Sequence, residues 1–233
     1  MQLYVGTSGF SYKEWKGPFY PEDLPAKQML HYYAQRLSSV EINNTFYRMP
    51  RSSVLESWAG QVPESFRFSI KASRRITHLR RLKEVSEETD YLLTALAALG
   101  ERLGVVLFQL PPNLKKDLPR LQGFLDLLAG RAPCAFEFRH ASWQEDEVLA
   151  CLREHGAALC CADSDDEAGS LIETAPFAYL RLRRAAYQDA ELAAWAQQLR
   201  DAPLERAFVF FKHEDAGAGP CMASAFGERL AGA

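Results

Sequence analysis

Short apolar runs alternate along the chain with longer stretches in which apolar residues recur at helical spacing. Runs this short, rich in Val, Leu, Phe and Tyr, are typical of strands that are buried on both faces. We expect eight strands, at 2–7, 39–43, 66–71, 104–110, 134–139, 157–162, 177–182 and 206–212. The amphipathic stretches predict helices at about 27–37, 52–60, 85–99, 117–129, 145–155, 189–200 and 221–231.

The alternation of strands and helices predicts an α/β fold with a mainly parallel sheet. Eight strand–helix units in 233 residues predict a (β/α)8 TIM-type barrel that forms a single domain over residues 1–233. The sixth unit is expected to be irregular, because the connection from Asp163 to Pro176 is rich in Asp. The alternative is an open doubly wound sheet, but Gly6-Thr7-Ser8-Gly9 lacks the spacing of its phosphate-binding loop.

Every predicted strand ends in polar side chains. Because side chains alternate faces along a strand, Glu41 shares a face with Asn43, and Glu137 shares one with Arg139. Active sites of such barrels lie at the C-terminal ends of the strands, so we expect these groups in the mouth. The other strand ends supply Thr7, Lys71, Gln109, Asp163, Arg181, Arg183 and Lys212. The alternative is that polar residues simply mark where strands emerge into water.

The predicted mouth carries more positive than negative groups. The loop after the third strand adds Arg74, Arg75, Arg80, Arg81 and Lys83. Such a mouth suits a small anionic ligand such as a phosphate or carboxylate. The alternative for the loop is a solvated basic start of a helix.

Three residues are candidates for catalysis. Glu41 and Glu137 come from opposite walls and could act as general acid and base if their pKa values were moved apart. Alternatively, Glu137 belongs to a structural network with Arg139 or Lys71. Lys71 could act as a Schiff-base nucleophile if other cations lowered its pKa, or it binds an anion or a glutamate.

Histidines and aromatic residues surround the predicted mouth. His78 and His140 flank strand ends, where they could shuttle protons or lie outside the site; His213 is expected to face away from the mouth. The loops are rich in aromatic residues that could stack on sugars or bases, or could instead plug the barrel rim. The candidates for substrate contact are Tyr12, Trp15, Tyr47 and Trp143.

We predict no cofactor and no metal ion. An oxygen-rich divalent site would need Glu41, Glu137, Asp163 and His140 together, and several cations would crowd such an ion. The five cysteines lack paired C-x-x-C spacing, so we expect small core residues in a reducing cytoplasm. The N-terminus does not resemble a signal peptide, and no apolar run is long enough to span a bilayer. The sequence gives no oligomeric state.

Five motifs in this order carry a family resemblance. They are GTSGFSYKEWKGPFYP (6–21), VEINNTFYRMP (40–50), FRFSIKASRRITH (66–78), LFQLPPN (107–113) and EFRHASW (137–143). Together they resemble the YecE-like family, also called domain of unknown function 72, over essentially the whole chain. The resemblance implies a TIM-type barrel.

The chain departs from the family pattern at two strand ends. Many members have a His-Gly pair after strand seven, where this chain has Arg181-Leu182-Arg183-Arg184. Many also end strand eight with paired asparagines, where this chain has Phe211-Lys212-His213-Glu214. This half of the mouth is expected to differ in what it binds.

Three functions are consistent with these residues. The first is a non-redox enzyme, a hydrolase, lyase or isomerase, that uses acid–base chemistry on a small anionic or sugar-like substrate. The second is a protein that binds or processes nucleic acid through the basic loop 74–83, although the net charge of −3 disfavours it. The third is a non-catalytic barrel that binds a metabolite.

Overall fold

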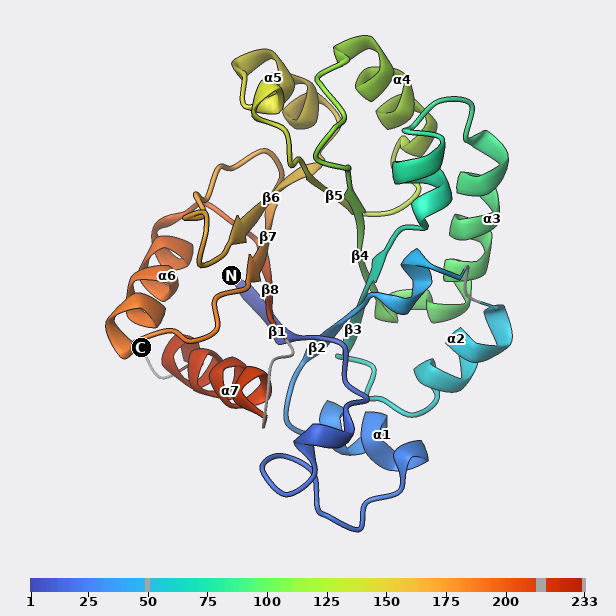
Figure 1. Cartoon of the computed structure of the whole chain (residues 1–233). Coiled ribbons are helices and arrows are strands. Elements are labelled where there is room, and N and C mark those ends of the chain that lie inside the picture. The colour runs from blue at the N-terminus through green and yellow to red at the C-terminus, as the bar shows by residue number, and fades with distance from the viewer. Residues whose placement is uncertain (49–50, 213–216, 232–233) are drawn as a thin grey trace.

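The strands of the protein close into a barrel in chain order, and each neighbouring pair is parallel. The computed structural model describes residues 1–48, 51–212 and 217–231 (Figure 1). The strands are β1 Gln2–Ser8, β2 Ser39–Ile42, β3 Arg67–Lys71, β4 Leu103–Gln109, β5 Cys134–Glu137, β6 Ala158–Asp163, β7 Phe177–Leu182 and β8 Arg206–Phe211. The predicted (β/α)8 TIM-type barrel is confirmed, and the open sheet is wrong.

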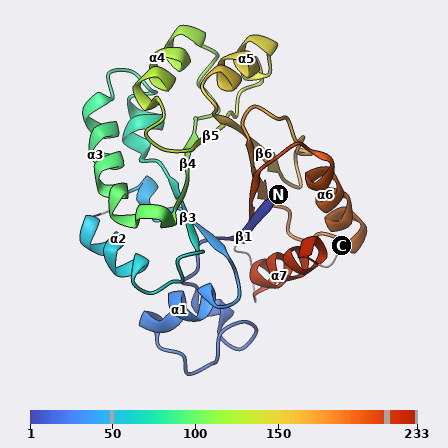
Figure 2. The same cartoon turned by 180° about the vertical axis from the view of Figure 1, so that it is seen from behind.

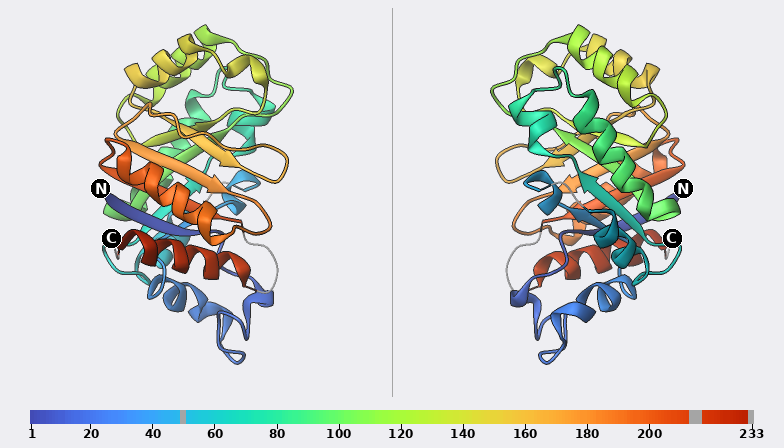
Figure 3. Two further views of the ribbon diagram at one scale, coloured as in Figure 1. Left: turned by 90° about the vertical axis from the view of Figure 1, so that its left-hand side faces the viewer. Right: turned by 90° about the vertical axis from the view of Figure 1, so that its right-hand side faces the viewer.

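Helices surround the barrel (Figures 1 and 2). They are α1 Met29–Ala34, α2 Ser52–Ala59, α3 Ser86–Leu96, α4 Leu118–Leu128, α5 Asp146–Glu154, α6 Asp189–Asp201 and α7 Ala218–Ala231. Residues 164–176, all of which the structure describes, contain no helix, so the sixth unit is irregular as predicted. Side views show the strands running in one direction, so that their C-terminal ends form one mouth (Figure 3).

Local sequence signals set several helix starts. The carboxylate of Asp117 accepts a hydrogen bond from the backbone N–H of Arg120 at 3.1 Å, which caps α4. At the start of α6, Gln188 and Glu191 form a capping box, with the Glu191 carboxylate 2.7 Å from the backbone N–H of Gln188. Both starts occur where side chains satisfy backbone N–H groups that the helix itself leaves unpaired.

Four strands end earlier than the sequence predicted, and in three of them a polar residue is left beyond the strand end. Asn43, Arg139 and Lys212 lie just beyond the ends of β2, β5 and β8. The backbone of Asn43 already has helical φ and ψ angles, because it leads into a 3-10 turn at Asn44–Phe46. These polar residues therefore stand on the rim, where the chain leaves the sheet.

Alternation along the strands separates two apolar layers. Inward-facing residues such as Val105, Leu107 and Phe210 fill the barrel interior. Their sequence neighbours, such as Val106 and Phe108, pack outward against the helices. The interior below the mouth is thus a packed core and not a channel, as expected for this fold. Within the described ranges, no helix is long and apolar enough to cross a membrane.

The close approach of β1 and β2 requires a glycine at position 6, and this can be tested. Gly6 pairs with Ser39, and a methyl group on Gly6 would overlap the backbone carbonyl of Ser39. We expect Gly6→Ala to lower the free energy of unfolding by about 1–3 kcal/mol, because a backbone atom cannot move aside cheaply. Urea denaturation measures the change.

The matched control is Gly123→Ala in α4, where an added methyl group meets no atom within 4 Å. This change should stabilise the protein by roughly 0.5–1 kcal/mol, since alanine favours a helix over glycine. Equal effects of the two substitutions would contradict the packing that we describe between β1 and β2.

Candidate functional site

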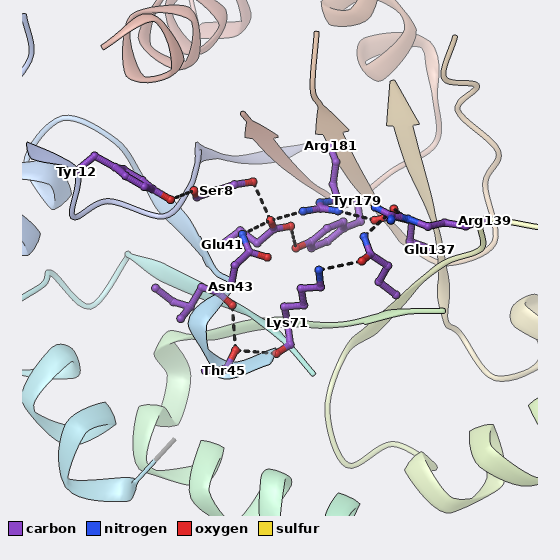
Figure 4. Close-up of polar contacts among 12 residues, drawn as sticks. Ser8, Tyr12, Glu41, Asn43, Thr45, Lys71, Glu137, Arg139, Tyr179 and Arg181 are labelled. Atoms are coloured by element: carbon purple, nitrogen blue, oxygen red, sulfur yellow. Dashed lines mark hydrogen bonds and ion pairs between the residues drawn. The ribbon is translucent and has the colours of Figure 1, made fainter. Parts of the chain in front are cut away.

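Arg181 lies at the centre of the mouth and joins two glutamates from other strands (Figure 4). Its side chain comes from the inner face of β7, and the residue is 1% exposed. Its Nη2 donates to Glu41 Oε1 at 2.9 Å, and its Nη1 donates to Glu137 Oε2 at 2.6 Å. The two carboxylates therefore converge as the sequence predicted, but they converge on an arginine of the protein itself.

Glu41 is completely buried and has a hydrogen-bond partner on each carboxylate oxygen. Its Oε1 also accepts from the hydroxyl of Ser8 at 2.8 Å and from the amide of Asn43 at 3.0 Å. Its Oε2 accepts from the hydroxyl of Tyr179 at 2.8 Å. Burial acts to raise the pKa of Glu41, but the charge of Arg181 and these hydrogen bonds outweigh it, so the pKa lies below its ordinary value.

Glu137 is held in the same way from the other side. Its Oε1 accepts from Gln109 Nε2 at 2.8 Å and from Arg139 Nε at 3.0 Å. Burial opposes ionisation, but the charges of Arg181 and Arg139 bring the pKa of Glu137 down to about 2. Both glutamates are therefore carboxylates at neutral pH, and their pKa values are not split as an acid–base pair requires. The geometry favours the alternative of a network that includes Arg139.

Lys71 stands at the end of this hydrogen-bonded chain. Its Nζ donates to Gln109 Oε1 at 2.9 Å and lies 4.4 Å from the centre of the Phe46 ring. Burial and the charge of Arg181 lower the pKa of Lys71 to about 8. The two glutamates raise it, but their charges are formally cancelled by the two neighbouring guanidinium groups. A protonated Lys71 therefore carries the unbalanced charge of the cluster.

The loop after β2 is attached to β3 beside Lys71. The hydroxyl of Thr45 is 3.0 Å from the carbonyl of Ile42 and 2.6 Å from the carbonyl of Lys71 (Figure 4). This attachment places the Phe46 ring against the lysine ammonium. The ring of His78 meets the same phenylalanine edge to face, with ring centres 4.8 Å apart. Burial and the charge of Lys71 lower the pKa of His78.

Three further predicted cations lie around the cluster. Arg139 is 41% exposed at the end of β5. Arg183 and Lys212 are half-buried just after β7 and β8. Burial and the charge of Arg181 lower the pKa of Arg183. His213, and Glu214 after it, lie outside the described residues.

Asp163 does not join the cluster. It shares the outward face of β6 with Cys161, and it is completely buried there. Its carboxylate accepts from the backbone N–H of Gly169 at 2.8 Å, from Arg184 Nη2 at 2.9 Å and from the hydroxyl of Tyr187 at 2.6 Å. Asp163 therefore ties the loop after β6 to the loop after β7. Thr7 likewise faces outward and donates its hydroxyl to the carbonyl of Gly9.

The aromatic candidates divide between wall and rim. Trp15 is completely buried, and Trp143 donates from Nε1 to the carbonyl of Leu114 at 2.8 Å. Tyr12 is half-buried and donates to the carbonyl of Ser8 at 2.8 Å. Tyr47 is 71% exposed. The two tryptophans thus build the walls, as the plugging alternative predicted, while Tyr47 faces solvent.

The remaining candidates do not assemble a metal site. Nδ1 of His140 accepts from the backbone N–H of Ser142 at 3.1 Å and so caps the 3-10 turn Ala141–Trp143. Among the residues that the structure describes, no three His, Cys, Asp or Glu side chains gather as metal ligands would. Asp163 and His140 are each engaged elsewhere.

Two residues of the cluster were missed in the sequence. Ser8 and Tyr179 both bind Glu41; Tyr179 lies two residues before Arg181, whereas Ser8 directly follows Thr7, the residue that the sequence predicted in the mouth. Alternation could have found them, because Tyr179 shares the face of Arg181, and Ser8 shares that of Tyr4. Tyr179 lies in an apolar run, where a tyrosine is usually a core residue, so the sequence did not indicate its hydrogen bond to Glu41.

The motifs and the barrel agree with a comparison with known families. A model of the family described as "Protein of unknown function DUF72" matches residues 4–233. The chain belongs to the DUF72 family. The predicted resemblance to the YecE-like family is therefore confirmed.

Relatives extend this comparison. UPF0759 protein YecE of Escherichia coli K12 is 30% identical over 152 residues, which are 63% of this chain and 53% of YecE. UPF0759 protein YunF of Bacillus subtilis is 27% identical over 149 residues, which are 60% of this chain and 52% of YunF. The matches thus span about half the length of these curated relatives. A DUF72 family protein from Thermotoga maritima has a TM-score of 0.85 at 28% identity, covering 99% of this chain and 100% of that one.

Removing the central guanidinium tests the cluster. Arg181→Leu leaves two buried carboxylates without their shared cation, so we expect the free energy of unfolding at pH 7 to fall by about 3–5 kcal/mol. The loss should shrink as the pH falls, because the stranded glutamates can then be protonated. Urea denaturation at a series of pH values measures both effects.

The free energy of unfolding of the wild type should itself decrease as the pH falls. The pKa of Glu137 is about 2 in the fold against an ordinary 4.5, so its contribution is present above 4.5 and is lost as the pH falls towards 2. The control is Arg139→Leu, whose more exposed side chain should cost about 1 kcal/mol or less. A loss in Arg181→Leu that is the same at every pH would contradict the charge argument.

Proposed function

We propose that this chain is a non-redox enzyme that moves a proton on a small anionic, hydroxyl-bearing substrate, with Lys71 as the general base. The amine of Lys71 carries the proposal. It is half-buried in the mouth, it is held by Gln109, and its pKa of about 8 leaves a substantial neutral fraction near neutral pH. General bases are most effective when their pKa lies near the working pH.

Cations at the rim support an anionic substrate group. Arg139 binds Glu137 through Nε, and its partly exposed guanidinium faces the approach to the mouth. Arg183 follows β7 and shares the face of Arg181, because the two residues are one strand repeat apart. A phosphate or carboxylate held between them would also supply the negative charge that balances Lys71.

Unsatisfied polar atoms support a substrate that bears hydroxyl groups. Oδ1 of Asn43 and Nε of Arg181 are buried without a hydrogen-bond partner among the described residues. A buried polar atom without a partner costs about 1–3 kcal/mol. A substrate hydroxyl donating to Asn43 Oδ1 would recover part of this cost, and sugar-like compounds provide such groups.

The saturated glutamates favour an isomerase or lyase over a hydrolase. Both carboxylates are hydrogen-bonded on both oxygens, and Arg181 holds each of them. A hydrolase of this kind needs a carboxylate that can activate water. Lys71 can instead remove a proton from carbon beside a carbonyl group, and the neighbouring cations can stabilise the negative charge that develops.

A screen of phosphorylated and carboxylated hydroxy compounds tests the proposal. We expect at least one to raise the Tm and to be converted, with kcat/KM increasing through a midpoint near pH 8 as Lys71 loses its proton. Lys71→Met should lower kcat by roughly 10²–10⁴-fold. The control is Lys83→Met, which removes an exposed lysine from the basic loop and should leave kcat unchanged.

Three results would overturn the proposal. Conversion that Lys71→Met leaves intact would exclude the lysine as the base. Binding without conversion of any bound compound would favour the non-catalytic metabolite-binding barrel. If a carbonyl compound and borohydride add mass at Lys71, the amine acts as a Schiff-base nucleophile and not as a base.

The pKa of Lys71 can be measured without a substrate. After reductive methylation with ¹³C-formaldehyde, one NMR resonance, absent from Lys71→Arg, should titrate near pH 8. Arg139→Gln removes a positive charge that lowers this pKa, so the midpoint should rise. A midpoint near the ordinary lysine value of about 10.4 would contradict the electrostatics of the cluster.

The rim offers a second candidate, the binding of single-stranded nucleic acid. The Arg74 guanidinium lies 5.8 Å from the centre of the exposed Tyr47 ring, an arrangement on which a base could stack. However, Arg75 and Arg80 both approach the carboxylate of Glu88, at 3.3 and 4.0 Å, and this reduces the charge that they present.

Fluorescence anisotropy with a labelled oligonucleotide tests this candidate. Binding should weaken steeply with salt and should be lost in Tyr47→Ala if the ring provides a stacking platform. No binding at low salt would exclude it.

A further inference from the structure

The barrel wall opens between β5 and β6 on the side of the mouth. Within the described residues, these strands pair at Ala135↔Ala158 and Phe136↔Leu159 alone. In contrast, β6 continues to pair with β7 up to Asp163. The last residues of β6 therefore have a strand on one side, and on the other side they border a pocket.

This β5–β6 pocket has a volume of about 330 Å³, at the lower end of the range for ligand sites. Its apolar lining comes from β6, α5, the segment after β5 and the loop after β6, and includes Phe138, Trp143, Leu149, Leu159, Cys161 and Ile172. Polar side chains of Gln144, Glu167 and Ser170 also contribute to the lining. The pocket is thus mainly apolar.

One wall of the pocket is rigid before anything binds. The rings of Phe138 and Trp143 stack with centres 4.6 Å apart and planes 9° apart. The indole is fixed by its hydrogen bond to the carbonyl of Leu114. Because these side chains are already ordered, an apolar group that enters loses little free energy to rearrangement of the wall.

The pocket lies beside the charged cluster. Cys160 lines it and shares the inward face of β6, where burial, Glu137 and Arg181 act on the pKa of its thiol. Phe138, Leu159 and Cys161 line the pocket from the outward face of the wall, so most of it lies behind Glu137. The gap between β5 and β6 is the route by which a molecule bound at Arg139 would extend into it.

We propose that the β5–β6 pocket binds the apolar part of the substrate, a short alkyl chain or a single ring joined to the anionic group. This assignment rests on the proposed anion-binding mouth. Two observations favour such a tail over a protein segment: the small volume, and the position of the pocket beside the gap between β5 and β6. The substrate class is thus an amphipathic monophosphate or carboxylate.

Binding of n-alkyl phosphates, from methyl to hexyl, tests the assignment by calorimetry. Inorganic phosphate gives the affinity of the mouth alone. We expect the affinity to stay near that of inorganic phosphate until the chain reaches the pocket. It should then increase up to about fourfold for each methylene group that is buried. The length at which the increase begins measures the path from the mouth to the pocket.

Two substitutions of leucine by tryptophan test whether the gain in affinity with chain length arises in this pocket. Leu149→Trp fills the pocket from α5 and should abolish the gain with chain length while leaving the affinity for inorganic phosphate unchanged. The matched control is Leu127→Trp, which alters a half-buried leucine of α4 at a separate cavity of about 530 Å³. This control should retain the full gain. If Leu149→Trp does not fold, Leu149→Ala should extend the gain to longer chains.

A neutral probe separates failure of the pocket from failure of the mouth. Hexanol should show ligand-observed NMR contacts with the wild type that Leu149→Trp loses, whether or not phosphate binds. If phosphate binds and neither chain length nor hexanol has an effect, the pocket assignment is overturned while the mouth stands. If hexanol binds in the pocket but no phosphate or carboxylate binds, the proposed function fails, and with it the assignment of the pocket to that substrate.

Discussion

The guanidinium group of Arg181 allows two carboxylates to be buried at the centre of this barrel. Two carboxylates buried at the end of a β-barrel would repel one another and would lose their hydration, a cost of several kcal/mol for each ion. Arg181 lies between Glu41 and Glu137 and donates to both of them. The interior below is apolar and cannot solvate these charges. The two carboxylates therefore require the arginine.

The rest of the site follows from this constraint. Glu137 orients Gln109 by accepting from its amide nitrogen, and this turns the amide oxygen towards Lys71. Glu41 fixes Ser8 and Tyr179 in the same manner on the opposite side. The network pairs its own carboxylates with guanidinium groups, and burial together with the charge of Arg181 lowers the pKa of Lys71 to about 8. A site that lacks one negative charge is prepared for an anion.

The loops are arranged around this centre, and those after β2 and β5 also reach it through Asn43 and Arg139. Thr45 attaches the loop after β2 to β3. Asp163 attaches the loop after β6 to that after β7, on the outer side of the wall. The loop after β6 also forms part of the pocket beside the separated strands β5 and β6. Charge and apolar space thus lie next to each other, which is the combination that an amphipathic substrate requires.

The sequence alone determined the barrel, because the apolar runs and the helical stretches are local patterns that short-range physics imposes. It also predicted that Glu41, Lys71, Gln109, Glu137 and Arg181 face the mouth, since alternation along a strand is equally local. The tertiary structure decided what these residues are to each other. Glu41 and Arg181 are 140 residues apart in the chain, and only closure of the barrel brings them to 2.9 Å. That contact turns a candidate acid–base pair into two fixed carboxylates. The pKa of Lys71, lowered to about 8, is also decided by the tertiary structure, because a pKa depends on burial and on charges that the linear sequence does not place.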